Sequence, residues 1–357
     1  MERHQTLKSF LADWADNNAT DDNATGDNAT NQAVAETINK LCGAAATIAD
    51  LIAQGALAGE MAAIVGDNAD GDAQKFLDVK SNELIFGALG ESPVAVMGSE
   101  EDEEAVPLNE GAPLAVAVDP LDGSSNIETN VSIGTIFSIF PTETAKDSAP
   151  ENVFFQPGSN QLAAGFMVYG PQTTIVFSVG QGTHVATLDR DSGEFLVTLT
   201  NMKMITGKHE YAINASNYRH WSPGVRAYID DCLAGADGPR GENYNMRWVA
   251  SLVAEAFRIL IRGGVFLYPG DNRDGYACGR LRLVYEAFPV AMIVEQAGGM
   301  ATDGSTRILD LVPDDLHQRI PLVFGPEDEV ERVKKYQESP PEKGATSPLF
   351  GHRGLFR

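Results

Sequence analysis

Residues 117–130 read AVDPLDGSSNIETN and decide how the rest of the chain is interpreted. Asp119 and Asp122 follow a short apolar run, and a Gly-Ser-Ser-Asn segment follows them. The residue before a proline is restricted to extended backbone, so Asp119 is expected to end a buried strand, where α/β folds place ligands. Gly123 to Asn126 can then open a helix whose free N–H groups would bind a phosphate.

Two carboxylates and a phosphate would repel one another at this position. A divalent cation between them would remove the conflict, and aspartate oxygens suit magnesium or manganese. The alternative is an Asx-type turn with a serine helix cap, which needs no ligand, because D-P-x-D-G is also favourable turn chemistry. The stretch by itself leaves both interpretations open.

Other acidic residues favour the metal interpretation. GSEEDEE, residues 98–104, follows a predicted strand, and Glu100 and Glu101 are nearest to the strand end. Asp72 and Asp78 flank the start of a predicted helix. Taken singly, each of these residues is also explained as solvated surface charge or as a helix-start residue that matches the helix dipole.

Length and charge limit the class of protein. A chain of 357 residues exceeds the size at which one hydrophobic core stops growing, so we expect two lobes. The formal net charge of −24 argues against a nucleic-acid partner and against an anionic membrane surface. Three widely spaced cysteines indicate no disulfide framework or zinc site. The N-terminal residues lack the apolar core of a signal peptide, which predicts a cytoplasmic protein.

Hydrophobic periodicity predicts an α/β chain. Short and nearly continuous apolar runs suit strands of a sheet that is covered on both faces. The predicted elements are helices 34–52, 74–89, 248–261 and 286–299, strands 93–97, 114–118, 135–140 and 264–268, and an antiparallel meander over 173–200.

The same pattern divides the chain into four parts. Three Asn-Ala-Thr triplets mark a polar N-terminal segment that is predicted to be disordered, with a glycosylated secreted protein as the alternative explanation of the triplets. The parts are this segment at 1–31, an N-terminal lobe at 32–204 with the acids and the DPLDGSS loop, a C-terminal lobe at 205–336, and a loose tail at 337–357.

Three motifs together resemble the class I fructose-1,6-bisphosphatases, in their bacterial form, over about residues 32–335. They are SEED at 99–102, AVDPLDGSSNI at 117–127 and LRLVYEAFPVAMIVEQAGGMATDG at 281–304. DPLDGSSN is specific to the wider lithium-sensitive sugar-phosphatase superfamily, and the Tyr-Glu-x-x-Pro segment separates this family from inositol monophosphatases. The resemblance implies an α/β (α+β layered) fold of alternating helix and sheet layers in two lobes.

The resemblance also implies an activity. The family hydrolyses the 1-phosphate of D-fructose 1,6-bisphosphate to fructose 6-phosphate and phosphate, in gluconeogenesis or the Calvin cycle. It implies two or three Mg²⁺ ions per subunit, with Mn²⁺ as a substitute, and a cytoplasmic homotetramer.

Site residues follow from the resemblance position by position. The implied metal ligands are Glu100, Asp119, Asp122, Glu286 and the carbonyl of Leu121. Glu101 and Asp78 would orient and deprotonate the attacking water, and Asp72 would serve as a further acid–base or third-metal group. The implied substrate contacts are Asp122, Gly123, Ser124 and Ser125 at the 1-phosphate, Asn214, Tyr218, Tyr268, Arg280, Ser251 and Leu252 at the sugar and its 6-phosphate, and Arg247 toward a neighbouring subunit.

The magnitude of the reaction barrier supports this chemistry. Enzymes accelerate phosphate-monoester hydrolysis by up to about 10²¹-fold, whereas a general base contributes roughly 10²–10⁴-fold. Metal ions and in-line positioning must supply most of the remainder. We therefore predict attack by a metal-activated water without a phosphoenzyme.

Two departures from the family pattern leave the sugar specificity open. Arg280 stands where relatives commonly have lysine, and Trp248 stands where a tyrosine hydroxyl usually meets the 6-phosphate. The alternatives are a dual fructose-1,6-/sedoheptulose-1,7-bisphosphatase, another phosphatase of the superfamily, and a non-catalytic sensor. A sensor would be expected to lack a matching acid, and all of them are present.

Overall fold

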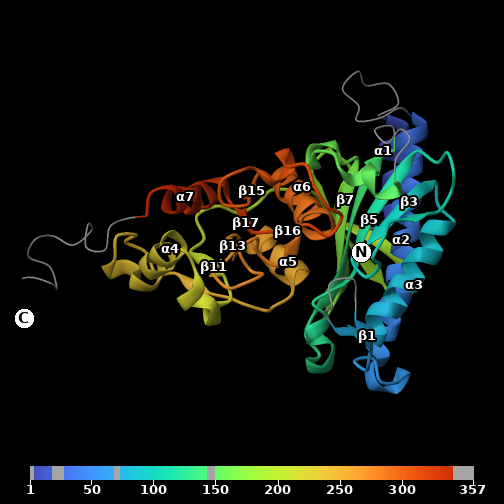
Figure 1. Ribbon diagram of the computed structural model, residues 1–357. Coiled ribbons are helices and arrows are strands. Elements are labelled where there is room, and N and C mark those ends of the chain that lie inside the picture. Colours follow the sequence, from blue (N-terminus) through green and yellow to red (C-terminus); the bar gives the residue numbers. More distant parts are fainter. Residues whose placement is uncertain (1–3, 18–27, 68–72, 143–148, 341–357) are drawn as a thin grey trace, which may run out of the picture.

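The computed structural model describes residues 4–17, 28–67, 73–142 and 149–340. Within these residues, helices and sheets alternate in five layers (Figure 1). This arrangement confirms the predicted layered α/β fold. The helix layers contain α1 (Leu7–Asn17), α2 (Asn28–Gln54) and α3 (Phe76–Gly90) on the outside, α5 (Leu252–Arg262) and α6 (Phe288–Gln296) in the middle, and α4 (Pro223–Ala234) and α7 (Glu327–Glu338) on the other outside.

The larger sheet has eight strands in the order β10-β9-β8-β7-β6-β5-β3-β4. All neighbouring strands are antiparallel except β3 and β5, which are parallel. The strands are β3 (Val94–Ser99), β4 (Val106–Pro107), β5 (Leu114–Asp122), β6 (Ile133–Pro141), β7 (Ala163–Tyr169), β8 (Thr173–Ser178), β9 (Thr183–Asp189) and β10 (Glu194–Met202). The predicted meander and the sheet with two covered faces are confirmed, since every residue of β5 is buried.

Strand β5 continues past the position where the sequence predicted its end. It runs to Asp122, and its pairing with β6 shifts between Asp119, opposite Ile136, and Asp122, opposite Gly134. Residues three apart in a regular strand face opposite sides, but the extra residue of a bulge turns both to one side. The predicted end at Asp119 was therefore wrong, and the bulge is what brings the two aspartates to the same face.

The smaller sheet organises the C-terminal part of the chain. Its strand order is β12-β11-β13-β17-β15, and a separate ribbon pairs β14 with β16. The strands are β11 (Glu210–Ala212), β12 (Asn245–Met246), β13 (Val265–Tyr268), β15 (Met300–Thr302) and β17 (Leu322–Gly325), with β14 (Leu281–Arg282) and β16 (Arg319–Ile320) in the ribbon. A short ribbon of β1 (Ile64–Asp67) and β2 (Ala73–Lys75) precedes α3.

Two helices of the middle layer begin later than the sequence predicted. Helix α5 starts at Leu252 because Ser251 is its N-cap and Ala250 has φ 61°, outside the helical region. Helix α6 is preceded by a π-helical turn, η8 (Leu283–Ala287), which carries Glu286. Both helix starts face the site described below. The structure therefore departs from the sequence prediction at positions that form this site.

Helix α2 supplies much of the core on the outer face of the larger sheet. Val34, Ile38 and Ile48 are buried against it, as the periodicity predicted. Among the described residues, the helical stretch Asn28–Ala58 has the length and hydropathy of a membrane span. The same apolar residues form the face that packs on the sheet, which accounts for that composition.

The prediction that residues 1–31 are disordered was wrong for part of this segment. Residues 7–17 form α1, which buries Leu7, Leu11 and Trp14 in the same core as α2. These residues are spaced four and three apart, so they form one apolar stripe. The third Asn-Ala-Thr triplet begins α2 at Asn28, whereas the first two triplets and the tail from residue 341 lie outside the described residues.

Substitution Leu11→Ala tests whether α1 belongs to the core. Leu11 is fully buried, so we expect the free energy of unfolding to fall by about 2–5 kcal/mol. Urea unfolding of the metal-free protein measures this change. Lys8→Ala, at an exposed position of the same helix, should leave the transition unchanged. Equal stabilities of Leu11→Ala and the parent would contradict the docking of α1.

Candidate metal centre and active site

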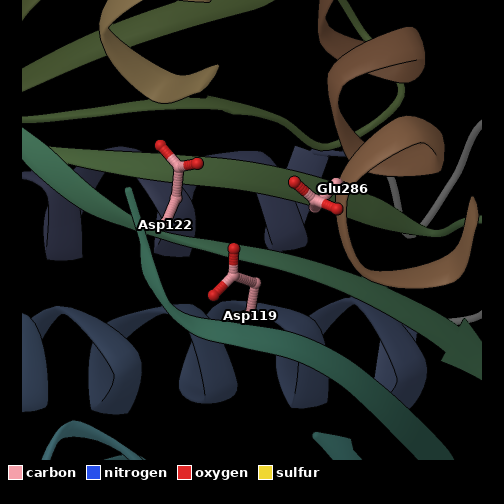
Figure 2. Close-up of side chains that lie close together, drawn as sticks. All are labelled: Asp119, Asp122 and Glu286. Atoms are coloured by element: carbon pink, nitrogen blue, oxygen red, sulfur yellow. The ribbon is translucent and has the colours of Figure 1, made fainter. Parts of the chain in front are cut away.

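Three acidic side chains from two distant segments converge in the structure. Asp119 and Asp122 extend from β5, and Glu286 extends from η8 toward them (Figure 2). Each offers a carboxylate oxygen, and these oxygens lie within 4.8 Å of one another. The three residues are only 4%, 8% and 6% exposed, so water screens their charges poorly.

Burial and mutual repulsion dominate the electrostatics of this cluster. Burial raises the pKa of Asp119 well above its usual value, and the charges of Glu100, Asp122 and Glu286 raise it further. Burial and Glu100 likewise raise the pKa of Glu286, and burial raises the pKa of Asp122. A divalent cation would stabilise the charged forms, and an all-oxygen ligand set suits Mg²⁺ or Mn²⁺. The residues present therefore fit a metal centre.

One oxygen of each carboxylate is held by the surrounding chain. The Asp122 carboxylate accepts hydrogen bonds from Ser251 Oγ at 3.0 Å and from the Val253 N–H at 2.9 Å, at the N-terminus of α5. The Asp119 carboxylate accepts one from the Leu121 N–H at 3.0 Å. The Glu286 carboxylate accepts one from the backbone N–H of Arg282 at 2.5 Å. These bonds fix the direction in which each carboxylate points.

The turn after β3 brings Glu100 to the same place. The Glu100 N–H donates to Val118 in the neighbouring strand at 3.1 Å, and its carboxylate lies 3.7 Å from the Arg282 guanidinium. Glu100 also contributes to the raised pKa of Asp119 and of Glu286. The structure thus brings Glu100 close to Asp119, Asp122 and Glu286, the four carboxylates that the family resemblance assigned to metal binding, and Leu121, between the two aspartates in sequence, is buried.

Asp78 and Glu101 form a second acidic pair beside the cluster. Burial raises the pKa of Asp78 to about 7, the Lys75 N–H opposes this rise, and the charge of Glu101 adds to it. Asp78 Oδ2 accepts from that N–H at 2.7 Å, while its Oδ1 is buried without a partner among the described residues. Gln74 Nε2 donates to Glu101 at 2.7 Å. Asp72 lies outside the described residues.

The expected helix after Asp122 is shorter than predicted. Residues 124–129 form a single 3₁₀ segment, η3 (Ser124–Thr129), instead of an α-helix. Gly123 has φ 78°, and a Cβ there would lie 3.2 Å from the Ser251 Cβ, so glycine is required for this turn to approach α5. Asn126 Nδ2 donates to the Ala250 carbonyl at 2.9 Å and ties the turn to the same loop. Ser124 is half-buried and Ser125 is exposed.

Some of the predicted sugar contacts are close to the acidic cluster. Ser251 and Leu252 begin α5 beside Asp122. Tyr268 is close enough to Arg280 and Glu286 for their charges to act on its hydroxyl, whose pKa is raised by burial and lowered by Arg280. Arg280 itself donates to the Tyr276 hydroxyl at 2.7 Å.

Other predicted contacts have different partners in the single chain. The Tyr218 hydroxyl donates to Asp230 at 2.7 Å, and Asn214 caps the 3₁₀ turn η6 (Ala215–His220). Arg247 is exposed and donates to the carbonyl of Met246 at 3.0 Å. The hydrogen bonds and ion pairs of the described residues do not join these three side chains to the acidic cluster.

Sequence reasoning missed Arg282, which is 2% exposed and lies between Glu100 and Glu286. The signal was an arginine inside the apolar run LRLVYE. A buried guanidinium requires anionic partners, so its position could have been connected with the acidic residues.

Comparisons with known proteins agree with this geometry. The family models described as "Fructose-1-6-bisphosphatase, N-terminal domain" and "Fructose-1-6-bisphosphatase, C-terminal domain" match residues 9–200 and 204–338. The chain belongs to the fructose-1,6-bisphosphatase family. This result confirms the resemblance on which the residue assignments were based.

Relatives in the fructose-1,6-bisphosphatase family cover nearly the whole chain. A class 1 fructose-1,6-bisphosphatase of Nitrobacter hamburgensis is 57% identical over 91% of this chain and 94% of its own. The class 1 protein of Azorhizobium caulinodans is 54% identical over 93% of this chain and 98% of its own. The crystal structure of Leishmania major fructose-1,6-bisphosphatase in holo form superposes with TM-score 0.84 at 33% identity, over 94% of this chain and 99% of that chain.

The raised carboxyl pKa values predict how metal changes stability with pH. Carboxyl groups of the unfolded chain have pKa values near 4. Between that pH and the raised pKa values of the folded state, the folded protein binds more protons than the unfolded chain. The free energy of unfolding therefore falls as the pH rises through this range. We therefore expect Mg²⁺ to raise the melting temperature more at about pH 8 than at about pH 6. Calorimetry with EDTA or Mg²⁺ measures this difference, and Asp119→Asn should reduce it. An equal metal effect at both pH values would contradict the repulsion argument.

Proposed function

We propose that the chain hydrolyses the 1-phosphate of D-fructose 1,6-bisphosphate to fructose 6-phosphate and phosphate. The observation that carries this proposal is the convergence of Asp119, Asp122 and Glu286 beside the Gly123–Ser125 turn. Membership in the fructose-1,6-bisphosphatase family and the names of the relatives support the substrate.

Glu100, Asp119, Asp122 and Glu286, with the carbonyl of Leu121, would hold two or three Mg²⁺ ions, and Mn²⁺ has similar oxygen preferences. When bound, these ions supply charge neutralisation and a more acidic water. The hydrogen bonds described above direct the carboxylates of Asp119, Asp122 and Glu286, so these three ligands are oriented before metal binds. The hydrogen-bonded second layer orients the ligands and thereby tunes affinity.

Glu101 and Asp78 would prepare the attacking water. A group with a pKa of about 7 exchanges protons readily at neutral pH, which is the requirement for general acid–base catalysis, and Asp78 meets it. Glu101 would orient the water and accept its proton, and Asp72 would act as a further acid–base group. The water oxygen then bonds to phosphorus as the bond from phosphorus to the sugar oxygen breaks, and that oxygen takes up a proton.

The remaining residues would bind the substrate. The Gly123–Ser125 turn would surround the 1-phosphate with N–H groups and hydroxyls. Asn214, Tyr218, Tyr268, Arg280, Ser251 and Leu252 would contact the sugar and its 6-phosphate. Arg247, which is exposed in the single chain, would reach the site of a neighbouring subunit in a cytoplasmic homotetramer. Such a position would account for the absence of Arg247 from the acidic cluster of its own chain.

Glu101→Gln tests the assignment of the water-activating acid. Because a positioned general base contributes roughly 10²–10⁴-fold, kcat should fall by that factor while the circular-dichroism spectrum and melting temperature stay unchanged. Glu104→Gln, an exposed acid in the same turn, serves as the matched control with parental activity. Near-normal turnover of Glu101→Gln would remove the assignment.

The sugar specificity is tested with two substrates. Trp248, which departs from the family pattern, stacks on Phe266 at 6.1 Å and lies 6.0 Å from Tyr268, ring centre to ring centre, so it packs against a proposed sugar contact. We expect a higher kcat/KM for fructose 1,6-bisphosphate than for sedoheptulose 1,7-bisphosphate, with phosphate release only in the presence of a divalent metal. Comparable values would indicate the dual enzyme, and inactivity on both sugars would refute the proposed function.

A further inference from the structure

The buried polar atoms near the metal centre that lack partners among the described residues include two on neighbouring rings. They are the Tyr285 hydroxyl and His317 Nδ1. Their rings are in contact in a tilted arrangement, with centroids 5.5 Å apart and an interplanar angle of 49°. Buried polar groups in folded proteins are nearly always hydrogen-bonded, so a pair of neighbouring orphans requires an explanation.

Tyr285 and His317 are attached to the same rigid unit. Tyr285 directly precedes Glu286 in η8. His317 lies just before β16, which pairs with β14, and the Leu283 N–H donates to the Gln318 carbonyl at 2.8 Å. The loop that carries His317 is therefore fixed to the segment that carries Glu286.

The other edge of the His317 ring contacts the acidic turn. Its Nε2 lies 3.3 Å from the carbonyl oxygen of Glu103, in the turn that also carries Glu100 and Glu101. A carbonyl accepts only, so Nε2 donates to it, and in the neutral ring with this tautomer Nδ1 is an acceptor. A phenol hydroxyl can donate, and the two orphaned atoms are thus a donor and an acceptor of matching kind.

We propose that the Tyr285 hydroxyl and His317 Nδ1 are joined through one buried water, which accepts from the hydroxyl and donates to the ring nitrogen. In this arrangement His317 is a positioning residue that holds the turn with Glu100 and Glu101 in place relative to Glu286. The inference rests on the proposed function, because it concerns the two halves of the same metal centre.

The acidic turn is contacted from two sides. From the side of α3, Asn82 holds the turn by donating to Asp102 at 3.1 Å and accepting from Ser99 Oγ at 2.8 Å. From the side of η8, the Arg282 guanidinium lies 3.7 Å from the Glu100 carboxylate. A directed bond through His317 would fix the turn from this second side.

Four variants test the connection. His317→Phe keeps a ring but removes both polar atoms, Tyr285→Phe removes one oxygen, and the double variant combines them. His317→Gln keeps one donor and one acceptor. The primary measurement is the dissociation constant of Mn²⁺ in the absence of substrate, by electron paramagnetic resonance. The half-saturating Mg²⁺ concentration for phosphate release is measured in parallel.

Loss of support around a ligand typically weakens metal binding by 10–100-fold. We expect each single phenylalanine variant to bind Mn²⁺ about tenfold more weakly, at the low end of that range, with a matching rise in half-saturating Mg²⁺ and little change in kcat at saturating metal. The double variant should be no weaker than His317→Phe, since the pair acts as a unit. His317→Gln should recover most of the affinity. His209→Phe serves as the control, because His209 directly precedes β11 of the smaller sheet. Its Mn²⁺ dissociation constant should equal that of the parent.

Unchanged Mn²⁺ affinity in both single variants, or losses that multiply in the double variant, would overturn the inference. Because Tyr285→Phe removes a single atom, it keeps the test decisive even where His317→Phe folds poorly. Failure of the parent itself to bind Mn²⁺ and release phosphate would instead refute the proposed function. The two failures are therefore distinguishable.

Discussion

Repulsion among the buried carboxylates of Asp119, Asp122 and Glu286 is the interaction around which the site is arranged. Such a cluster is unfavourable by itself, because burial and like charge both raise the free energy of the ionised forms. The chain holds it in place through irregular backbone: a bulge in β5, the π-turn η8 and the short η3 turn. The bulge and the π-turn carry the three carboxylates, and the η3 turn follows Asp122 directly.

The layered core explains how this arrangement is tolerated. Strand β5 is buried along its whole length, and α5 and α6 separate the two sheets, so the metal centre lies on rigid elements (Figure 1). The N-terminus of α5 faces Asp122 and offsets part of its charge through the helix dipole and the Val253 N–H. Apolar packing thus makes the elements around the site rigid, and a small number of backbone N–H donors orient the carboxylates.

The sequence predicted regular elements and residue types better than local geometry. Apolar periodicity located α2, the strands of the meander and β13, because burial leaves a pattern along the chain. The bulge at Asp119 to Asp122 left no such pattern, since it depends on the register with β6. The role of Arg282 and the pairing of Tyr285 with His317 depend on contacts across the chain. Helix α1 was missed because polar triplets beside it dominated the composition of residues 1–31.

The net negative charge of the chain links metal binding to substrate binding. With a net charge of −24, the protein repels an anionic sugar bisphosphate, and the buried carboxylates strengthen that repulsion where the phosphate must bind. Arg280 would offer positive charge at the proposed sugar contacts, whereas the Gly123–Ser125 turn itself offers neutral donors, with the Lys75 ammonium bonded to the Ser124 carbonyl at 3.0 Å and shared with Glu128. Occupancy of the acidic cluster by cations and binding of the 1-phosphate must therefore favour one another, and thermodynamic linkage makes this coupling equal in both directions. Residues that position the carboxylates, although they touch no substrate, act on substrate affinity through the same coupling.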